Sequence, residues 1–307
     1  MEKVIVVIGP TSVGKTKMGV ALAKKFNGEV ISGDSMQIYK QMDIGTAKVT
    51  EEEKEGIIHH CVDILNPDET YSVHDFQQTV RKKITEITQR GHVPIIVGGT
   101  GLYIKAALYD YQFDEMKNDH HAINEKYKDY TNEQLHDHLK SIDEESAKIL
   151  HFNNRRRVLR AIEIYETTGK RKSEMLEEQE HICLYDAYFV GLTLPRDVLY
   201  ERINKRVDVM MENGLKEEME RLYSQGLTRN HQSMKAIGYK EWFDYYDHQI
   251  DLNDVLELIK KHSRQYAKRQ YTWFKNQFDV HWYDVNLENF EQTIEQVTDD
   301  IEKILKV

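Results

Sequence analysis

The sequence predicts an α/β protein with a parallel sheet, organised around a phosphate-binding loop and carrying a helical insertion. Three observations predict this fold. The apolar run Val4–Ile8 is typical of a buried parallel strand, and a glycine-containing loop at residues 9–16 follows it directly. An amphipathic helical pattern occupies residues 17–26. Strand patterns give way to helical ones between residues 113 and 189, so we expect an α/β core in 1–112 and 190–307 and a helical insertion domain in 113–189.

The loop at residues 9–16, called the phosphate loop below, is the strongest local signal. Glycines let backbone N–H groups turn inward without a Cβ clash, and the positive end of the helix dipole faces the same point. Lys15 adds a cation, and the Thr16 hydroxyl is placed to bind Mg²⁺. The alternative is an ordinary glycine turn. The order strand, loop, helix favours a P-loop NTPase-like core with phosphate bound by Gly9, Pro10, Thr11, Ser12, Val13, Gly14, Lys15 and Thr16.

A carboxylate follows the second predicted strand, residues 29–32. Asp34 comes two residues after that strand. In an open α/β sheet the ligands bind at the carboxyl ends of the strands, so we expect Asp34 at the same rim as the phosphate loop. A turn or helix cap formed by the Asp side chain is an equal alternative.

The third predicted strand, residues 93–97, ends in Gly98-Gly-Thr-Gly101 and not in an acidic residue. A phosphate-loop hydrolase is expected to have an acid there that organises Mg²⁺ and water. The glycines therefore weaken an ATPase interpretation and favour close approach of a substrate to the backbone. Thr100 is a candidate contact, with a helix N-cap as the equal alternative.

Composition narrows the class of protein further. The chain has 307 residues and a formal net charge of −10, which argues against a bulk nucleic-acid coat but leaves room for a local basic patch. Its two cysteines have no metal spacing, and the pair His59-His60 lacks further ligands nearby, so we predict a loop there and no metal centre. No apolar run reaches the length of a membrane span, and no signal peptide is expected, so we predict a cytoplasmic location.

Two segments concentrate positive charge. Residues 153–172 carry seven basic and two acidic side chains, with Arg156 and Arg160 one helical turn apart and Arg157 beside them. Residues 258–275 carry six basic side chains and no acidic one. Solvated helix faces would explain both segments, and RNA phosphates are the functional alternative.

A further helix is predicted to begin at Pro195 and to end at Gly214. It places Arg202 and Arg206 on one face, where two guanidinium groups could bind a diphosphate. Surface ion pairs are the simpler explanation by spacing alone.

Several blocks of the chain together resemble the tRNA dimethylallyltransferase family. They are the phosphate loop, Ile31-Ser-Gly-Asp-Ser-Met-Gln-Ile-Tyr39, Met42-Asp-Ile-Gly-Thr-Ala-Lys48, Gly98-Gly-Thr-Gly-Leu-Tyr103, Gly238-Tyr-Lys-Glu241 and Tyr266-Ala-Lys-Arg-Gln270. The resemblance spans nearly the whole chain. It implies transfer of a dimethylallyl group from its diphosphate to N6 of the adenosine 3′-adjacent to the anticodon of tRNA. It also implies tRNA, through its anticodon stem-loop, as the macromolecular substrate; it does not imply a protein partner.

The site residues follow from these motifs and the resemblance together. We expect Asp34, Thr100, Arg202 and Arg206 to be catalytic, Asp34 as the base that takes the N6 proton and one of the arginines as a diphosphate contact. Mg²⁺ is the expected cofactor, with Thr16 as a ligand. The expected tRNA-binding residues are Asp34, Ser35, Met36, Gln37, Thr100, Arg156, Arg157, Val158, Leu159, Arg160, Lys235, Lys240, Lys260, Arg264 and Lys268.

Three other functions share parts of this pattern. A small-molecule kinase would use the same loop with ATP and would not need the two basic segments. An ATPase or switch would need an acid after residue 97. An RNA-binding protein without catalysis would not need Lys15.

Overall fold

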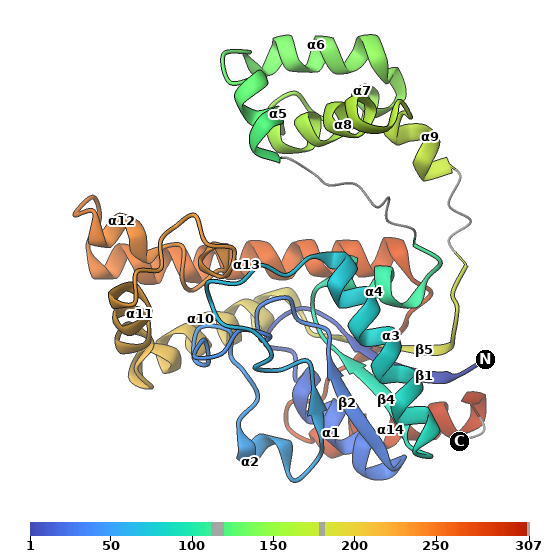
Figure 1. Ribbon diagram of the computed structural model, residues 1–307. Coiled ribbons are helices and arrows are strands. Elements are labelled where there is room, and N and C mark those ends of the chain that lie inside the picture. The colour runs from blue at the N-terminus through green and yellow to red at the C-terminus, as the bar shows by residue number, and fades with distance from the viewer. Residues whose placement is uncertain (112–119, 178–181, 306–307) are drawn as a thin grey trace. The chain divides into compact units, whose positions relative to one another are not determined.

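The computed structural model describes residues 1–111, 120–177 and 182–305 (Figure 1). The chain divides into two compact units. Residues 1–109 and 183–307 form the core unit, and residues 110–182 form the helical unit. The described residues include no helix with the length and apolar character needed to cross a membrane.

A six-stranded parallel sheet forms the centre of the core unit, in the order β3-β2-β4-β1-β5-β6. Strand β1 lies between β4 and β5, with Ile5 opposite Ile95 on one side and Tyr188 on the other. The expected loop at His59-His60 is instead a short edge strand, because its backbone pairs with β2. The strands are β1 (Lys3–Ile8), β2 (Gly28–Ser32), β3 (His59–His60), β4 (Val93–Val97), β5 (Asp186–Thr193) and β6 (His281–Asp284).

Helices cover both faces of this sheet, as Figure 1 shows. Side chains alternate along β1: Val4, Val6 and Ile8 join the buried cluster of one face, while Ile5 and Val7 join that of the other. The first face packs on α3 (Val73–Gln89) and α4 (Gly101–Leu108), and the second packs on α1 (Lys15–Lys25) and α14 (Phe290–Leu305). Because both faces of the sheet are buried under helices, the central strands appear in the sequence as continuous apolar runs.

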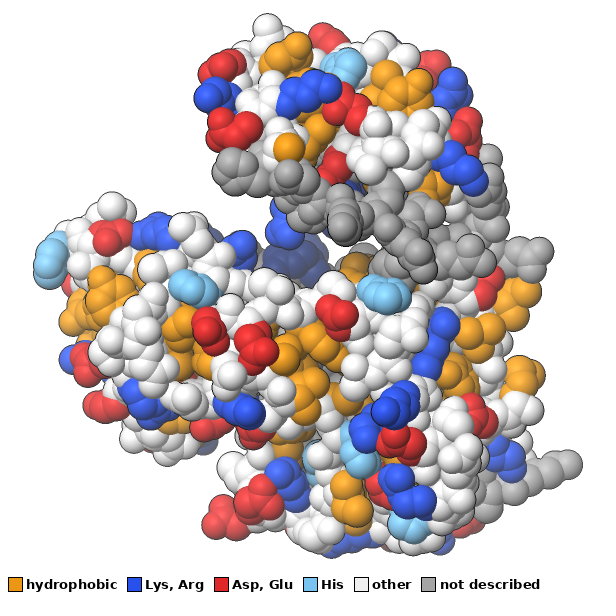
Figure 2. Space-filling model, in the orientation of Figure 1, with side chains coloured by type: hydrophobic (Ala, Val, Ile, Leu, Met, Phe, Trp, Pro, Cys, Tyr) orange, Lys and Arg blue, Asp and Glu red, His pale blue; other side chains and the backbone are white. Residues whose placement is uncertain are grey.

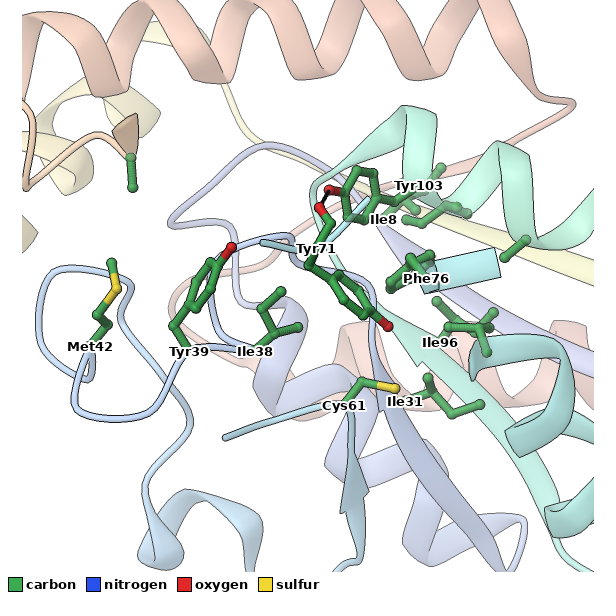
Figure 3. Packing of buried hydrophobic residues seen from close by; sticks show 14 of the residues in the cluster. Ile8, Ile31, Ile38, Tyr39, Met42, Cys61, Tyr71, Phe76, Ile96 and Tyr103 are labelled. Carbon is green, nitrogen blue, oxygen red and sulfur yellow. Dashed lines mark hydrogen bonds between the residues drawn. The ribbon is translucent and has the colours of Figure 1, made fainter. Parts of the chain in front are cut away.

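The first cluster extends from the sheet toward the segment after β2 (Figure 3). Ile31 and Ile96 pack under Phe76 of α3, and the Tyr103 hydroxyl of α4 donates to the Tyr71 carbonyl at 3.4 Å. At the start of α3, Ser72 accepts from the backbone of Asp75 in a capping box. These contacts hold the carboxyl ends of β2 and β4 close together.

The remaining helices of the core unit lie around the carboxyl ends of the strands. The long helix α13 packs against both α10 and α4. Pro195 is the N-cap of α10 and not its first helical residue, which moves the predicted start by one position. These helices are α2 (Glu51–Lys54), α10 (Arg196–Glu212), α11 (Leu215–Ser224), the 3₁₀ turn η1 (Ser233–Lys235), α12 (Trp242–Tyr246) and α13 (Leu252–Gln277).

The helical unit has its own small apolar core, built from residues of α6 and α8 such as Leu135, Leu139 and Ile162. Val158 and Leu159 also lie in this core, at 0% and 6% exposure. Their side chains pack among apolar neighbours, and contact of these two residues with tRNA stays a prediction. The helices of this unit are α5 (His120–Lys126), α6 (Asn132–Ile142), α7 (Glu144–Ile149), α8 (Arg155–Thr168) and α9 (Lys172–Glu177).

Candidate active site

The segments that follow four of the strands lie at one edge of the sheet. The phosphate loop follows β1, Asp34 follows β2, Thr100 follows β4, and α10 follows β5. Because all strands are parallel, these segments converge at the carboxyl edge. The sheet order therefore assembles the predicted site from segments far apart in the chain.

The phosphate loop is held in a conformation that two of its glycines permit. Gly9 and Gly14 have φ of 145° and 102°, and a Cβ at Gly9 would lie 2.5 Å from the carbonyl oxygen of Leu192. Helix α1 begins at Lys15, two residues earlier than predicted, and Gly14 at its N-cap offers no side-chain oxygen to the first amides. The helix N-terminus thus presents unpaired donors of the kind that bind an anion.

Lys15 lies inside this site. Its Nζ donates to the carbonyl of Pro10 at 2.7 Å. Burial, together with the nearby Arg206 charge, lowers the pKa of Lys15 to about 7, although Asp34 acts in the opposite direction. A bound anion would restore the positive charge on Lys15, because opposite charges favour the ionised form.

Both predicted arginines reach the phosphate loop from α10. The Nε of Arg202 donates to the Ser12 carbonyl at 3.0 Å, and Nη1 of Arg206 donates to the Thr11 hydroxyl at 3.1 Å. Burial lowers the pKa of Arg206, but a guanidinium remains charged at physiological pH. The arrangement brings two cations to the same side of the loop.

Asp34 forms a turn and also faces the site. Its Oδ1 accepts from the backbone amides of Met36 and Gln37, at 2.8 and 3.4 Å. Among the described residues, both hydrogen bonds to this carboxylate end on Oδ1, and Asp34 lines the cavities at this edge. The turn that was the alternative is therefore present, and it orients the carboxylate.

Thr100 precedes α4, but its side chain makes no capping hydrogen bond. Its Oγ1 instead accepts from the Ser35 amide at 3.1 Å and lies 3.3 Å from the Ser35 hydroxyl. Thr100 thus joins the end of β4 to the residue after Asp34.

Two adjoining cavities lie at this edge. The larger, of about 750 Å³, is lined by Lys15, Thr16, Gln37, Arg202 and other residues of the rim. The smaller, of about 330 Å³, is lined by Ser35, Met36, Lys235, Lys240, Tyr266 and Arg269, among others. Thr11, Ser12, Asp34 and Arg206 line both. Asp34 therefore lies where a group bound in the larger cavity could contact a group bound in the smaller one.

Other predicted residues lie elsewhere. Lys260 pairs with Asp208 of α10 at 2.8 Å, and the Arg264 guanidinium hydrogen-bonds the Asn204 side chain of the same helix. These two side chains join α13 to α10, whereas Lys268 is exposed on α13. Acidic and basic side chains lie intermingled over the face of the core unit that Figure 2 presents.

The basic residues of α8 belong to the helical unit. Arg156 and Arg157 are exposed, while Arg160 forms an ion pair with Glu163 at 2.8 Å.

The sequence did not indicate the role of Glu218 on α11. Its buried carboxylate accepts from the amides of Asp43, Ile44 and Gly45, at 2.9, 2.8 and 3.1 Å, and from the hydroxyl of Tyr239. These bonds fix the backbone of residues 43–45, which leads to Thr46 and Ala47 in the lining of both cavities. No local signal marks a carboxylate whose backbone partners lie more than 170 positions away.

Tyr266 and Gln270 of α13 were also missed as individual site residues. The Tyr266 hydroxyl donates to the Gly99 carbonyl at 3.3 Å, and burial with the nearby Asp34 charge raises the pKa of Tyr266 to about 12. Both residues belong to the block Tyr266–Gln270 that carried the resemblance, which was the available signal.

The fold and the cavity define the class: a P-loop NTPase-like α/β protein whose larger cavity is lined by basic and acidic side chains, with Asp34 at the end of β2. The model of the family described as IPP transferase matches residues 37–277. The chain is 55% identical to tRNA dimethylallyltransferase of Bacillus cereus (strain AH187), over 92% of this chain and 90% of that protein. The chain belongs to the IPP transferase family and is a transferase.

Solved structures agree with this assignment. The tRNA delta(2)-isopentenylpyrophosphate transferase of Staphylococcus epidermidis is 47% identical, with a TM-score of 0.74 and 99% of each chain covered. A eukaryotic dimethylallyltransferase acting on tRNA is 33% identical, with a TM-score of 0.85, covering 99% of this chain and 79% of that one.

Proposed function

We propose that this chain transfers a dimethylallyl group from dimethylallyl diphosphate to N6 of the adenosine 3′-adjacent to the anticodon of tRNA, releasing diphosphate. The names of its relatives support the reaction. The observation that carries the proposal for the site is the position of Asp34, which lines both the cavity of the phosphate loop and the cavity beside it.

The larger cavity would bind the diphosphate. The amides at the start of α1, together with Lys15, Arg202 and Arg206, would hold its oxygens. Negative charge grows on the leaving oxygen as the allylic C–O bond breaks, so these groups stabilise the transition state more than the ground state. The glycines after β4 leave no acid to organise a hydrolytic water, which disfavours the ATPase alternative.

The smaller cavity would receive the adenine. An adenine stacked in the anticodon loop must leave the stack to reach it. The N6 lone pair attacks the allylic carbon, a N–C bond forms, and the C–O electron pair leaves on the diphosphate. The N6 proton passes to the Asp34 carboxylate, which offsets the poor nucleophilicity of an exocyclic amine. Thr100, through Ser35, would hold the turn that carries Asp34.

Mg²⁺ is the proposed cofactor. The described residues contain no group of three or more His, Cys, Asp or Glu side chains that could hold a metal alone. This fits Mg²⁺, which keeps several waters and is bound by few protein oxygens together with substrate phosphates. The Thr16 hydroxyl lines the larger cavity and would supply one such oxygen. The ion, when bound, would neutralise charge on the diphosphate.

Basic side chains of both units would bind the RNA backbone. Arg156 and Arg157 on α8 and Lys268 on α13 are exposed, whereas Lys235 and Lys240 line the smaller cavity. Phosphate contacts of this kind would position the anticodon stem-loop without reading its sequence.

Mass analysis of tRNA tests the reaction. Bulk tRNA lacking the modification is incubated with the chain, Mg²⁺ and dimethylallyl diphosphate, then digested to nucleosides. We expect an adenosine heavier by one dimethylallyl group. In parallel, ATP with tRNA should remain intact. Unchanged adenosine together with tRNA-stimulated ATP hydrolysis would support the ATPase alternative.

A further inference from the structure

Gln270 of α13 connects two parts of the site through one side-chain amide. Its Oε1 accepts from the backbone N–H of Thr11 in the phosphate loop at 2.9 Å. Its Nε2 donates to the carbonyl of Gly99, after β4, at 3.0 Å. The side chain is 5% exposed, so both bonds lie away from bulk water. A buried amide that satisfies an acceptor and a donor at once has a fixed orientation.

The chain makes room for this amide at Gly99. A Cβ there would lie 2.2 Å from Nε2 of Gln270. Gly99 has no positive φ, so the requirement for glycine comes from the close approach and not from backbone strain. The glycine and the glutamine therefore act as one fitted pair.

The Thr11 N–H and the Gly99 carbonyl, which Gln270 bonds, belong to segments with different roles in the proposed reaction. The Thr11 hydroxyl also accepts a hydrogen bond from Arg206, on the side where the diphosphate would bind. Gly99 precedes Thr100, which holds the Ser35 amide next to Asp34, on the side of the base. The amide offers one acceptor and one donor together, whereas a carboxylate of the same length lacks the donor and a thioether offers neither strongly.

We propose that Gln270 is a positioning residue for the transfer reaction, one that sets the separation between the phosphate loop and the Asp34–Thr100 segment. This inference rests on the proposed function. Gln270 acts through Thr11 and Gly99, so loss of its side-chain amide should misplace the diphosphate relative to the base and slow the chemical step. Misplacement by about 1 Å costs on the order of 100-fold in rate.

The test compares single-turnover rates of the full chain at saturating tRNA and dimethylallyl diphosphate. Gln270→Met keeps the length of the side chain and removes both bonds. We expect its rate, corrected for the folded fraction, to fall about 10- to 100-fold, with the affinity for inorganic diphosphate changed less than about threefold. Gln277→Met is the matched control, because Gln277 lies exposed on the same helix and bonds Lys105. It should keep the wild-type rate.

A second pair of variants keeps the test decisive if Gln270→Met folds poorly. Gly99→Ala places a Cβ against the Gln270 side-chain amide. Gln270→Ala removes that amide, so the double variant has no such clash. We expect both single variants to be slow and the double variant to be no slower than the slower single, because all three break the same connection.

The outcomes separate the two proposals. Wild-type chain that forms no dimethylallyl adenosine overturns the proposed function and this inference with it. An active wild-type chain with wild-type rates in Gln270→Met and Gly99→Ala overturns only the inference, and a lower unfolding temperature with unchanged rate in these variants shows a purely structural role.

Discussion

Arg206 donates to the Thr11 hydroxyl at 3.1 Å and so joins α10 to the phosphate loop. The two residues are 195 positions apart. Their contact places a partly buried cation near Lys15, and this charge, after burial of the lysine itself, contributes to lowering the pKa of Lys15. The proposed diphosphate site therefore depends on tertiary packing as well as on the loop motif.

The first prediction concerns this arginine. Arg206→Gln should weaken binding of inorganic diphosphate by about 10- to 100-fold, since a charged hydrogen bond contributes about 1.5–3 kcal/mol. Equilibrium titration measures the change. Arg196→Gln, on the same helix but stacked over Tyr200, should bind normally. Equal affinity of Arg206→Gln and wild type would remove Arg206 from the diphosphate site.

The second prediction concerns proton uptake at Lys15. With a pKa of about 7, this amine is mostly neutral at pH 8 and mostly charged at pH 6. A bound diphosphate should raise that pKa, so binding should take up close to one proton at pH 8 and far less at pH 6. Calorimetric titration in buffers of different ionisation enthalpy counts the protons.

Lys15→Met should abolish this pH dependence, whereas Lys17→Met, an exposed side chain paired with Glu291, should retain it. Proton uptake that is the same at pH 6 and pH 8 in wild type contradicts the account.

The third prediction concerns stability and the buried Glu29 of β2. Burial by itself favours the neutral carboxyl, but hydrogen bonds from Arg90 and His60 outweigh it and lower the pKa of Glu29 to about 2. Because the folded value lies below the unfolded one, the carboxylate stabilises the fold above about pH 4.5. That stabilisation is lost as pH falls toward 2.

Glu29→Gln should lower the free energy of unfolding at pH 7 by about 3 kcal/mol, as linkage over this pKa range implies. Urea unfolding at several pH values measures it, with the exposed Glu52→Gln as control. The difference between Glu29→Gln and wild type should shrink from pH 5 to pH 2; a constant difference would mean that Glu29 is not the titrating group.

The fourth prediction separates RNA contacts from structural ion pairs. Arg156→Gln should reduce the slope of log K against log salt for tRNA by up to about one unit, because one phosphate contact is lost. Lys260→Gln should leave the slope unchanged and lower stability, since Lys260 already pairs with Asp208. Filter binding across a salt series distinguishes them, with Lys148→Gln of α7 as control. The reverse pattern would place the RNA on α13 and not on α8.

Local patterns predicted much of this architecture and left the long-range contacts open. Apolar runs marked β1, β2 and β4, and the phosphate loop was evident because its eight residues are contiguous in the chain. The edge strand β3 is only two residues long and has no periodicity to detect. Spacing placed Arg202 and Arg206 on one helix face but could not decide between a surface ion pair and the loop.

The side chains that assemble the site were hardest to predict. Gln270 bonds a residue 259 positions away, and Glu218 bonds residues more than 170 positions away. Such pairs depend on how α11 and α13 pack, which local sequence does not encode. For the same reason, Lys260 resembled a free basic residue until its contact with α10 was seen.

Asp34 carries the central claim, that a carboxylate at the end of β2 takes the N6 proton. The most direct measurement is the single-turnover rate of Asp34→Asn at saturating substrates across a Mg²⁺ series, with the exposed Asp68→Asn as control. Asn keeps the size of the side chain and cannot act as a base, so the rate should fall about 10²- to 10⁴-fold, with tRNA and diphosphate affinities changed less than about tenfold. Recovery of the rate at high Mg²⁺ would assign Asp34 to the metal. A wild-type rate at every Mg²⁺ concentration would contradict the account.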